Sequence, residues 1–421
     1  MTRVPSLFLP QEDKMARQAA VKPVFPTQSK NTKDLVDQFK TLADIANVGA
    51  AVQYLETAKE DEKIEVQIQK KKSESSKDAD FIAGIVRKME DKFGAGSALT
   101  PTAETVLCKV EHWVSTRNFL IDSAIAGGLP MPRPLIPFGR MTEISGLNST
   151  GKTSFLGHIV AETQATGGIA AVSDTEEALD LAYWEQLGVD LSRLIIVPAA
   201  NIEEVFTKVE TLVDLIRAAG DDRLICIGWD SLGGTPTKEQ EQAEADDKFY
   251  ASAAKVVGQN LQRIIGKISK KRIGFVITNH LYRKMNVKFG DPWETYGGEK
   301  VKFLATLRIR LENIGQINEG TDEEKQTIGH RVKVKIIKNK MAPILRTVEV
   351  PCLGGLGFSI DYSIYEHGQV QGLITGKTWK EWNGVKFQGW RGFQDKIVTC
   401  DDYPELIQKV IANYFHKATM K

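Results

Sequence analysis

The chain has 421 residues, 42% of them hydrophobic and 26% charged, and a formal net charge of +1. This length suggests two or three domains, and the composition is that of a protein that can bury a sizeable hydrophobic core. The charge excludes a polycationic surface, so any nucleic-acid site must be local to a groove or loop. The four cysteines are far apart, without a CxxC pair, which argues against a disulfide framework and a zinc site. Without an apolar run of about 18 residues or a signal-peptide pattern, we expect no membrane contact and a reducing, cytoplasmic compartment.

Residues 1–77 are predicted to form an N-terminal extension. Residues 1–30 are rich in Pro, Gln and Lys and are typical of a flexible arm, whereas residues 32–55 carry apolar side chains at helical spacing. The charged, Ser-rich residues 59–80 indicate a linker or a solvated helix. Beyond them, an apolar stripe from Ile82 to Met89 stops before Gly94, which predicts an amphipathic helix with a glycine stop.

The middle of the chain alternates short apolar runs with helical patterns. The runs lie at 141–145, 169–173, 194–197, 224–228 and 273–278. This rhythm predicts an α/β fold with a mostly parallel sheet covered by helices on both faces. Two later runs, 305–312 and 331–338, alternate strictly and predict strands with one wet face that extend the sheet's edge. Residues 354–421 contain a cluster of Trp and Lys and a final amphipathic helix over 404–415, and predict a small C-terminal α+β domain.

A nucleotide-binding motif follows the first apolar run. Residues 146–153 fit G-x-x-x-x-G-K-S/T and lead into a helical pattern. In this strand–loop–helix context, which disfavours a chance glycine turn, backbone N–H groups converge on phosphates, so we expect ATP and Mg²⁺. Lys152 would serve the β- and γ-phosphate oxygens, and Thr153 the Mg²⁺. The expected nucleotide-binding residues are Gly146, Leu147, Asn148, Ser149, Thr150, Gly151, Lys152, Thr153 and Ser154.

Acidic residues follow two of the other apolar runs. Asp230 lies just beyond the carboxyl end of the run at 224–228, where a carboxylate that organises Mg²⁺ belongs, although an isolated Asp there is more often a cap or turn residue. Asp174, Glu176 and Glu177 follow the run at 169–173. One of these three carboxylates is a candidate to polarise the attacking water, but residue type alone does not choose among them or exclude a solvated acidic turn.

From about Asp78 to its end the chain resembles the RecA-type recombinases of bacteria and phages. The segments that carry the resemblance are EDKFGAGSAL, similar to the end of the helix by which one subunit docks on the next, GGLPMPRPLIPFGRMTEISGLNSTGKTS around the phosphate motif, and SDTEEALDLAYWEQLGVD. The last segment implies that Glu176 activates the water and that Asp180 and Tyr183 lie beside the adenine. Without the resemblance, Tyr183 would be interpreted as a core aromatic residue.

The resemblance also implies two DNA-binding loops. His280 stands where the family carries a phosphate sensor, usually Gln in bacterial members, and is closer to the phage UvsX type. Residues 281–303 are similar to a mobile DNA-binding loop, and a loop at 236–248, acidic here, matches the second one. A solvated surface loop is the alternative for 281–303. Cations for phosphates, an aromatic wedge and flexible glycines suit single-stranded DNA. The expected DNA contacts are Lys255, Arg283, Lys284, Lys288, Phe289, Gly297 and Gly298.

Lys338 and Lys340 match a lysine pair that reaches the γ-phosphate held by the neighbouring subunit; without the resemblance they would be two surface lysines. The resemblance therefore implies a Mg²⁺-dependent, DNA-dependent ATPase in a bacterial or phage-infected cell. It would form helical homo-oligomeric filaments on single-stranded DNA and exchange strands with double-stranded DNA. Two rivals are a hexameric helicase motor built on the same core and an ATP-gated filament that coats DNA without strand exchange.

We divide the chain accordingly into four parts. Residues 1–77 are the extension, which has no recognised counterpart in the family, and residues 78–130 are the oligomerisation helix and lead-in. Residues 131–353 are a RecA-like ATPase core with the DNA-binding loops. Residues 354–421 are the C-terminal domain, whose Trp and Lys cluster is either a duplex-capture site or ordinary core packing.

Overall fold

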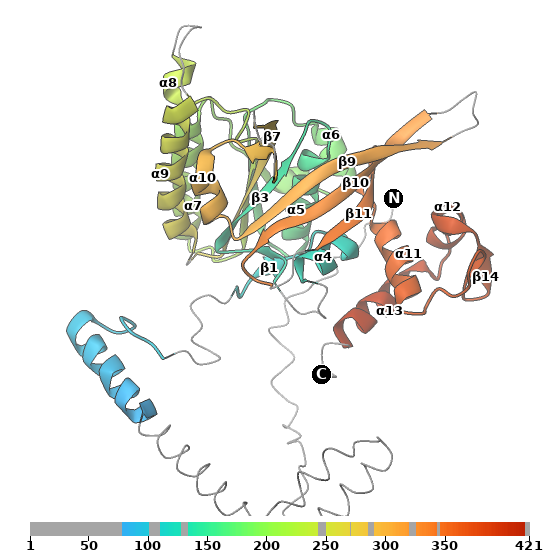
Figure 1. Cartoon of the computed structure of the whole chain (residues 1–421), viewed down its shortest axis with the longest axis horizontal. Coiled ribbons are helices and arrows are strands. Elements are labelled where there is room, and N and C mark those ends of the chain that lie inside the picture. Colours follow the sequence, from blue (N-terminus) through green and yellow to red (C-terminus); the bar gives the residue numbers. More distant parts are fainter. Residues whose placement is uncertain are drawn as a thin grey trace, which may run out of the picture. The chain divides into compact units, whose positions relative to one another are not determined.

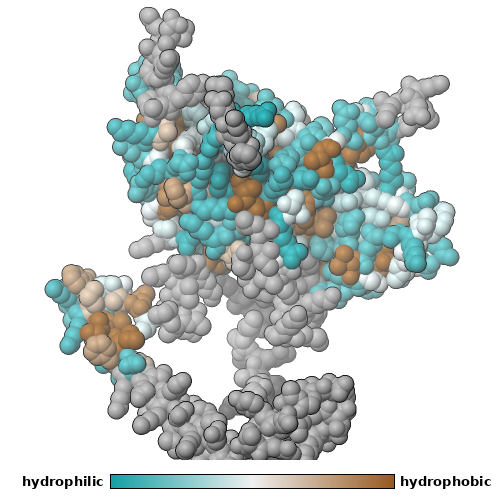
Figure 2. Space-filling view, viewed as in Figure 1, coloured by the Kyte–Doolittle hydropathy of each residue, from teal (hydrophilic) through white to brown (hydrophobic). Residues whose placement is uncertain are grey.

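The computed structural model describes residues 78–100, 110–127, 134–242, 250–269, 271–284, 290–319, 326–342 and 346–416. They fall into two compact units that divide at Val110. The described part of the smaller unit is a helix over residues 78–93, drawn in blue in Figure 1, which ends before Gly94 at φ +96°. Its apolar stripe is exposed and gives the brown patch on this helix in Figure 2: Phe81, Ile82, Ile85, Met89 and Phe93. The predicted amphipathic helix is thus confirmed, whereas the prediction for residues 32–55 lies outside the described residues.

The larger unit is built on one sheet. Its strands are β3 (Arg140–Gly146), β4 (Ile169–Asp174), β5 (Leu194–Ile196), β6 (Ile225–Asp230), β7 (Ile273–Arg283), β8 (Trp293–Thr295), β9 (Leu307–Glu319), β10 (Gln326–Asn339), β11 (Thr347–Leu353) and β12 (Gly357–Phe358). In the described residues the order is β12-β11-β10-β9-β3-β7-β6-β4-β5, with β8 on β7. Neighbours from β9 to β5 are parallel, and β10, β11 and β12 add antiparallel strands beside β9.

Helices cover both faces of this sheet (Figure 1). They are α4 (Phe119–Ile125), α5 (Lys152–Ala165), α6 (Leu181–Gln186), the 3₁₀ turn η2 (Leu191–Arg193), α7 (Ile202–Ala218), α8 (Lys238–Glu241), α9 (Tyr250–Ile268) and α10 (Gly298–Leu304). Cys226 of β6 joins the core under α5, whereas its neighbours Ile225 and Ile227 join the core under α7 and α9. Successive strand residues thus feed opposite faces, which confirms the doubly covered α/β sheet.

The C-terminal part has its own core. It comprises α11 (Ile360–Val370), the hairpin β13 (Lys380–Trp382) and β14 (Val385–Phe387), α12 (Gly389–Phe393), the π-helical turn η3 (Gln394–Val398) and α13 (Tyr403–His416). Phe387 and Phe393 are fully buried in this core. Trp382 is buried and Trp390 packs against the core, whereas Trp379 is 58% exposed. Of the three tryptophans in the cluster, Trp379 is therefore the most exposed. A short pair, β1 (Trp113–Val114) and β2 (Ile136–Pro137), also belongs to the larger unit.

One predicted strand is longer than its apolar run. The run at 273–278 continues as β7 to Arg283, because Leu281, Tyr282 and Arg283 pair antiparallel with β8. This pairing raises a small hairpin above the carboxyl edge of the parallel strands. In the part of the chain that the structure describes, no helix is long and apolar enough to cross a membrane.

Candidate active site

The loop between β3 and α5 forms a cradle for an anion. At Gly146, a Cβ atom would lie 2.3 Å from Thr150 Oγ1. Gly151 adopts the left-handed φ of +87°, and its Cβ would lie 3.2 Å from Cys352 Sγ, so no other residue fits without strain. No side chain in the described residues caps α5. Its first backbone N–H groups are therefore available to a phosphate.

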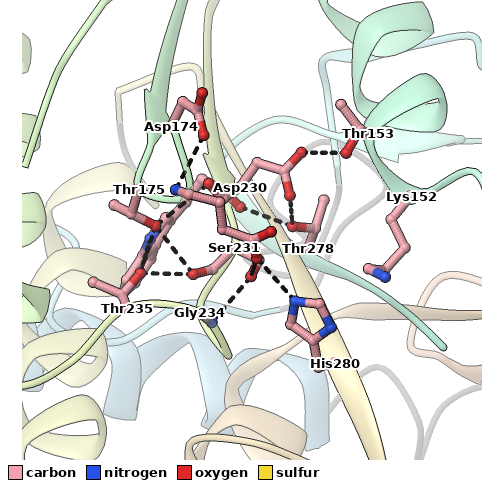
Figure 3. A network of polar contacts seen from close by, with 12 residues as sticks. Lys152, Thr153, Asp174, Thr175, Asp230, Ser231, Gly234, Thr235, Thr278 and His280 are labelled. Carbon is pink, nitrogen blue, oxygen red and sulfur yellow. Dashed lines mark hydrogen bonds and ion pairs between the residues drawn. The ribbon is translucent and has the colours of Figure 1, made fainter. Parts of the chain in front are cut away.

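Lys152 and Thr153 open α5 at this cradle. Lys152 Nζ donates to the Leu147 carbonyl at 3.0 Å. Burial lowers the pKa of Lys152, and the nearby carboxylates of Asp230 and Glu176 oppose that shift. Thr153 Oγ1 donates to Asp230 Oδ2 at 2.6 Å (Figure 3). One oxygen from the first turn of α5 and one from the end of β6 therefore lie side by side.

Asp230 is 8% exposed at the carboxyl end of β6. Thr278, on the neighbouring strand β7, donates to its second carboxylate oxygen. Burial raises the pKa of Asp230, while the hydrogen bonds from Thr153 and Thr278 lower it. Thr278 was not assigned a role from the sequence; it could be found only by placing the ends of β6 and β7 side by side.

Glu176 lies in the turn that follows β4 and contacts residues at the ends of β6 and β7. Its Oε1 accepts from Ser231 and lies 2.9 Å from His280 Nε2. Burial tends to raise the pKa of Glu176, but the hydrogen bonds from His280 and Ser231 outweigh burial and hold the pKa below its usual range. Ser231 is a site residue that the sequence did not indicate. A Cβ on Gly234 would lie 2.6 Å from Glu176 Oε1, so this glycine makes room for the carboxylate.

The other two carboxylates of the acidic turn do different things. Asp174 accepts from the backbone N–H of Glu176 at 3.2 Å and of Leu179 at 2.8 Å, and so shapes the turn. Glu177 has a left-handed φ of +50°. Of the three candidates that the residues left open, only Glu176 contacts Ser231 and His280.

Of the two residues expected beside the adenine, Tyr183 contacts the phosphate-loop helix α5 and Asp180 caps α6. Asp180 is the N-cap of α6, and its Oδ1 accepts from the Tyr183 N–H at 3.0 Å. The Tyr183 hydroxyl lies 2.7 Å from Ser154 Oγ on α5. Burial raises the pKa of Tyr183, with the Ser154 hydrogen bond acting against it. Tyr183 is therefore fixed to the phosphate-loop helix and is partly buried against the core.

The lysine pair lies away from this cradle within the chain. Lys338 pairs with Arg308 at the start of β9. Arg308 in turn pairs with Glu143 of β3, three residues before Gly146, so the lysine lies toward the opposite edge of the sheet from the cradle. Lys338 donates to the Phe303 carbonyl at 3.0 Å, and Lys340 to the same carbonyl at 3.2 Å. Burial and the neighbouring cations Lys340 and Arg308 lower the pKa of Lys338 to about 8.

The expected DNA contacts are only partly described. Arg283 and Lys284 are exposed at the end of β7, and Lys284 pairs with Glu294. Lys255 is exposed on α9, whereas Lys288 and Phe289 lie outside the described residues. Gly297 and Gly298 have φ of +90° and +76° at the start of α10. A Cβ at Gly298 would lie 3.0 Å from Ala254 Cβ, so this glycine allows α10 to pack closely on α9.

Comparison with known proteins gives a consistent result. Residues 80–359 match the family model described as the RecA N-terminal domain. A Protein RecA of Trichormus variabilis is 32% identical over 327 residues, 77% of this chain and 86% of the relative. Protein RecA of Cytophaga hutchinsonii is 34% identical over 303 residues, which are 72% of this chain and 80% of the relative. Protein RecA of Prochlorococcus marinus is 31% identical over 352 residues, 83% and 91% of the two chains.

Proposed function

The chain belongs to the RecA family of DNA-dependent ATPases that act in recombination and repair, and from this premise we propose how its own residues act. A filament of identical subunits assembles on single-stranded DNA, binds ATP and Mg²⁺, and exchanges strands with a homologous duplex. The observation that carries the proposal is the convergence of Lys152, Thr153, Asp230 and Glu176 at one edge of the sheet, beside the base of the candidate DNA loop.

The site fits ATP and Mg²⁺. The cradle over residues 146–151 has glycine at its first and last positions, where a Cβ atom would meet close neighbours. Helix α5 begins there without a side-chain cap. Thr153 and Asp230 supply two oxygen donors, the one or two protein ligands that Mg²⁺ takes beside substrate phosphates. Bound Mg²⁺ would neutralise charge that develops on the phosphates. Tyr183 and Asp180 would border the adenine.

Hydrolysis depends on Glu176 and Lys152. A carboxylate with a lowered pKa is ionised at neutral pH and is able to accept a proton from a water molecule. Ser231 and His280 hold that carboxylate in place, and Lys152 offers positive charge to the phosphate oxygens. Lys338 and Lys340 lie too far below the cradle to serve their own site, which supports a role at the site of the neighbouring subunit.

His280 connects nucleotide state to DNA binding. It touches Glu176 at the phosphate site, and three residues later β7 carries Arg283 into the candidate DNA loop. A change at the γ-phosphate would thus move a residue on the same strand as the DNA contacts. This is a switch in which one phosphate biases the order of a loop.

The domain division follows the same scheme. The exposed apolar stripe over residues 81–93 supports docking on a neighbouring subunit, and residues 131–353 act as the ATPase core. The C-terminal part from residue 354 would capture duplex DNA through exposed residues such as Trp379. Since its substrates are ATP and DNA, we place the protein in the cytoplasm of a bacterial or phage-infected cell.

A strand-exchange assay tests the proposal. The purified chain is incubated with ATP, Mg²⁺, circular single-stranded DNA and either a homologous or a heterologous linear duplex. We expect joint molecules with the homologous duplex only. Products with neither duplex, together with intact DNA-stimulated ATPase, would contradict strand exchange and favour a filament that only coats DNA. Electron microscopy of the same mixture distinguishes filaments from the rings of a helicase motor.

A further inference from the structure

A cavity lies beside the phosphate loop. It has a volume of about 710 Å³, and its walls come from the loop after β3, the β7–β8 hairpin, and the strands β9 and β10. Pockets that bury a small ligand measure about 300–1,000 Å³. Lys152, Thr153, Asp230 and Glu176 are absent from the cavity wall. The cavity therefore lies beside the phosphate site, with which it shares Leu147, Asn148 and Thr150 of one loop.

One side of this cavity is apolar and includes an aromatic ring. Trp293 is half-buried on β8, and Leu281 and Leu311 are buried nearby on β7 and β9. Leu147, at the tip of the phosphate loop, completes this side and is 46% exposed. A half-buried indole beside leucines is a surface on which a flat, uncharged ring can stack.

The cations of the cavity are already paired. Arg310 lies 2.6 Å from Asp291, and Lys335 lies 2.7 Å from Glu312. Both pairs line the cavity, so it carries little net charge. A phosphate would have to displace a carboxylate from each cation, whereas a neutral ligand would not. The charge pattern thus disfavours a phosphate and favours a neutral heterocycle.

The polar groups suit the edge of such a ring. Arg310 is 8% exposed, and its Nε is buried with no hydrogen-bond partner in the described residues. A buried donor without an acceptor is costly, and a ring nitrogen or carbonyl oxygen would satisfy it. Asn148 and Asn313 on the same wall add amide groups that donate and accept.

We propose that this cavity binds one unstacked base of the single-stranded DNA, with the base stacked on Trp293. The proposal rests on the proposed function, because the loop between β7 and β8 would bring the DNA strand to the cavity. Trp293 lies directly opposite Arg283, an expected phosphate contact, so backbone and base would be held by one hairpin. Arg310 and Leu311 lie opposite Ser145 and Gly146, so a bound base would contact the strand beside the phosphate loop.

Binding of oligo(dT) and of an abasic oligomer of equal length tests this proposal. Both carry the same phosphates, but only oligo(dT) offers bases. Affinity is measured by fluorescence anisotropy on the full chain with a slowly hydrolysed ATP analogue. We expect Trp293→Ala to weaken oligo(dT) binding at least about fivefold, as for one lost base stack, and to leave abasic binding unchanged. Trp293→Phe keeps a stacking ring and should restore most of the preference for oligo(dT).

The matched control is Tyr282→Ala. Tyr282 is an exposed aromatic on the same hairpin but does not line the cavity, so this variant should keep the full preference for oligo(dT). Equal oligo(dT) affinity in Trp293→Ala and the wild type would overturn the base pocket. So would an equal loss for both oligomers, or a loss in Tyr282→Ala as large as in Trp293→Ala. A wild-type chain that binds neither oligomer would instead overturn the proposed function.

Discussion

Glu176 is held by two hydrogen bonds at one oxygen, and this suggests a substitution that changes its chemistry and little else. In Glu176→Gln the amide oxygen still accepts from Ser231 and His280, but no carboxylate is left to take a proton. We expect ATP turnover to fall by about 10²–10⁴-fold while ATP binding persists. DNA-stimulated ATPase and binding of a fluorescent nucleotide measure the two effects. Glu177→Gln in the same turn serves as the control, and normal turnover in Glu176→Gln would refute this assignment.

The contact between His280 and Glu176 predicts a pH effect. Because the pKa of Glu176 lies below its usual range, the carboxylate stays ionised as the pH falls and is lost as a base only below that lowered pKa. Glutamine at position 280 keeps a hydrogen bond but never carries a charge. In His280→Gln we therefore expect the acid limb of the DNA-stimulated ATPase profile to move to higher pH. A pH profile superimposable on that of the wild type would remove His280 from this response.

The choice among the three acidic residues shows where residue-level prediction from sequence stops. Asp174, Glu176 and Glu177 share one turn, and each has the right functional group. Their difference lies in partners about 55 to 105 positions away, Ser231 and His280, which only the order of β4, β6 and β7 brings together. The phosphate loop was predictable because its residues are consecutive. The Ser231 and Thr278 contacts were not, because they depend on neighbouring strand ends.

At the scale of elements, the segment that leads into α4 meets α5 and α4 through buried ionisable groups. Glu162 of α5 lies 3.7 Å from Arg117, and burial raises its pKa to about 7 despite that cation. Asp122 of α4 is held by Ser115 and Thr116, and burial raises its pKa to about 6. Because its folded pKa is raised, Glu162 favours the folded state most when it is protonated. This contribution to stability is fully present below the unfolded pKa of about 4.5 and is lost as the pH rises through the folded pKa of about 7.

Glu162→Gln mimics the protonated form and tests this sign. Above pH 7 the variant should be more stable than the wild type by about 1 kcal/mol or more, a rise in Tm of about 2–4 °C. Toward pH 5 the difference should shrink, because the wild-type carboxyl group then keeps its proton in the folded state. Thermal melts followed by circular dichroism from pH 5 to 9 measure this. A lower Tm for Glu162→Gln at pH 8 would mean that the ion pair with Arg117 outweighs burial.

The elements themselves were largely predictable from the sequence. Alternation in β6, where Ile225 and Ile227 feed one core and Cys226 the other, is visible in the sequence because side chains on a strand alternate with a period of two. The extension of β7 to Arg283 was not predictable, since it depends on a three-residue partner strand without an apolar run of its own. Antiparallel pairing of β10 with both β9 and β11 is likewise decided by long-range contacts.

At the scale of the whole molecule, the helix over residues 78–93 predicts how subunits join. Phe81 is 70% exposed and Ile85 45%, and a stripe of this kind on a folded chain marks an interaction surface. Phe81→Asp with Ile85→Asp should abolish filaments on single-stranded DNA and reduce DNA-stimulated ATPase at least about tenfold, because desolvating a charge at an apolar interface is costly. Electron microscopy and sedimentation measure assembly. Arg87→Glu, on the opposite side of the helix, is the control, and filaments in the double variant would contradict this role.

The position of the lysine pair predicts that the catalytic unit is shared between two subunits. Lys338 and Lys340 lie below their own phosphate cradle, whereas Glu176 borders it. A chain with Glu176→Gln and a chain with Lys338→Ala and Lys340→Ala should each be nearly inactive alone. Mixed in equal amounts, they should recover ATPase, because an intact Glu176 in one chain then meets intact lysines from the other. Random head-to-tail mixing gives about one quarter of the wild-type sites. If the lysines acted on their own cradle, every site in the mixture would lack either the carboxylate or the cations, and no activity would return.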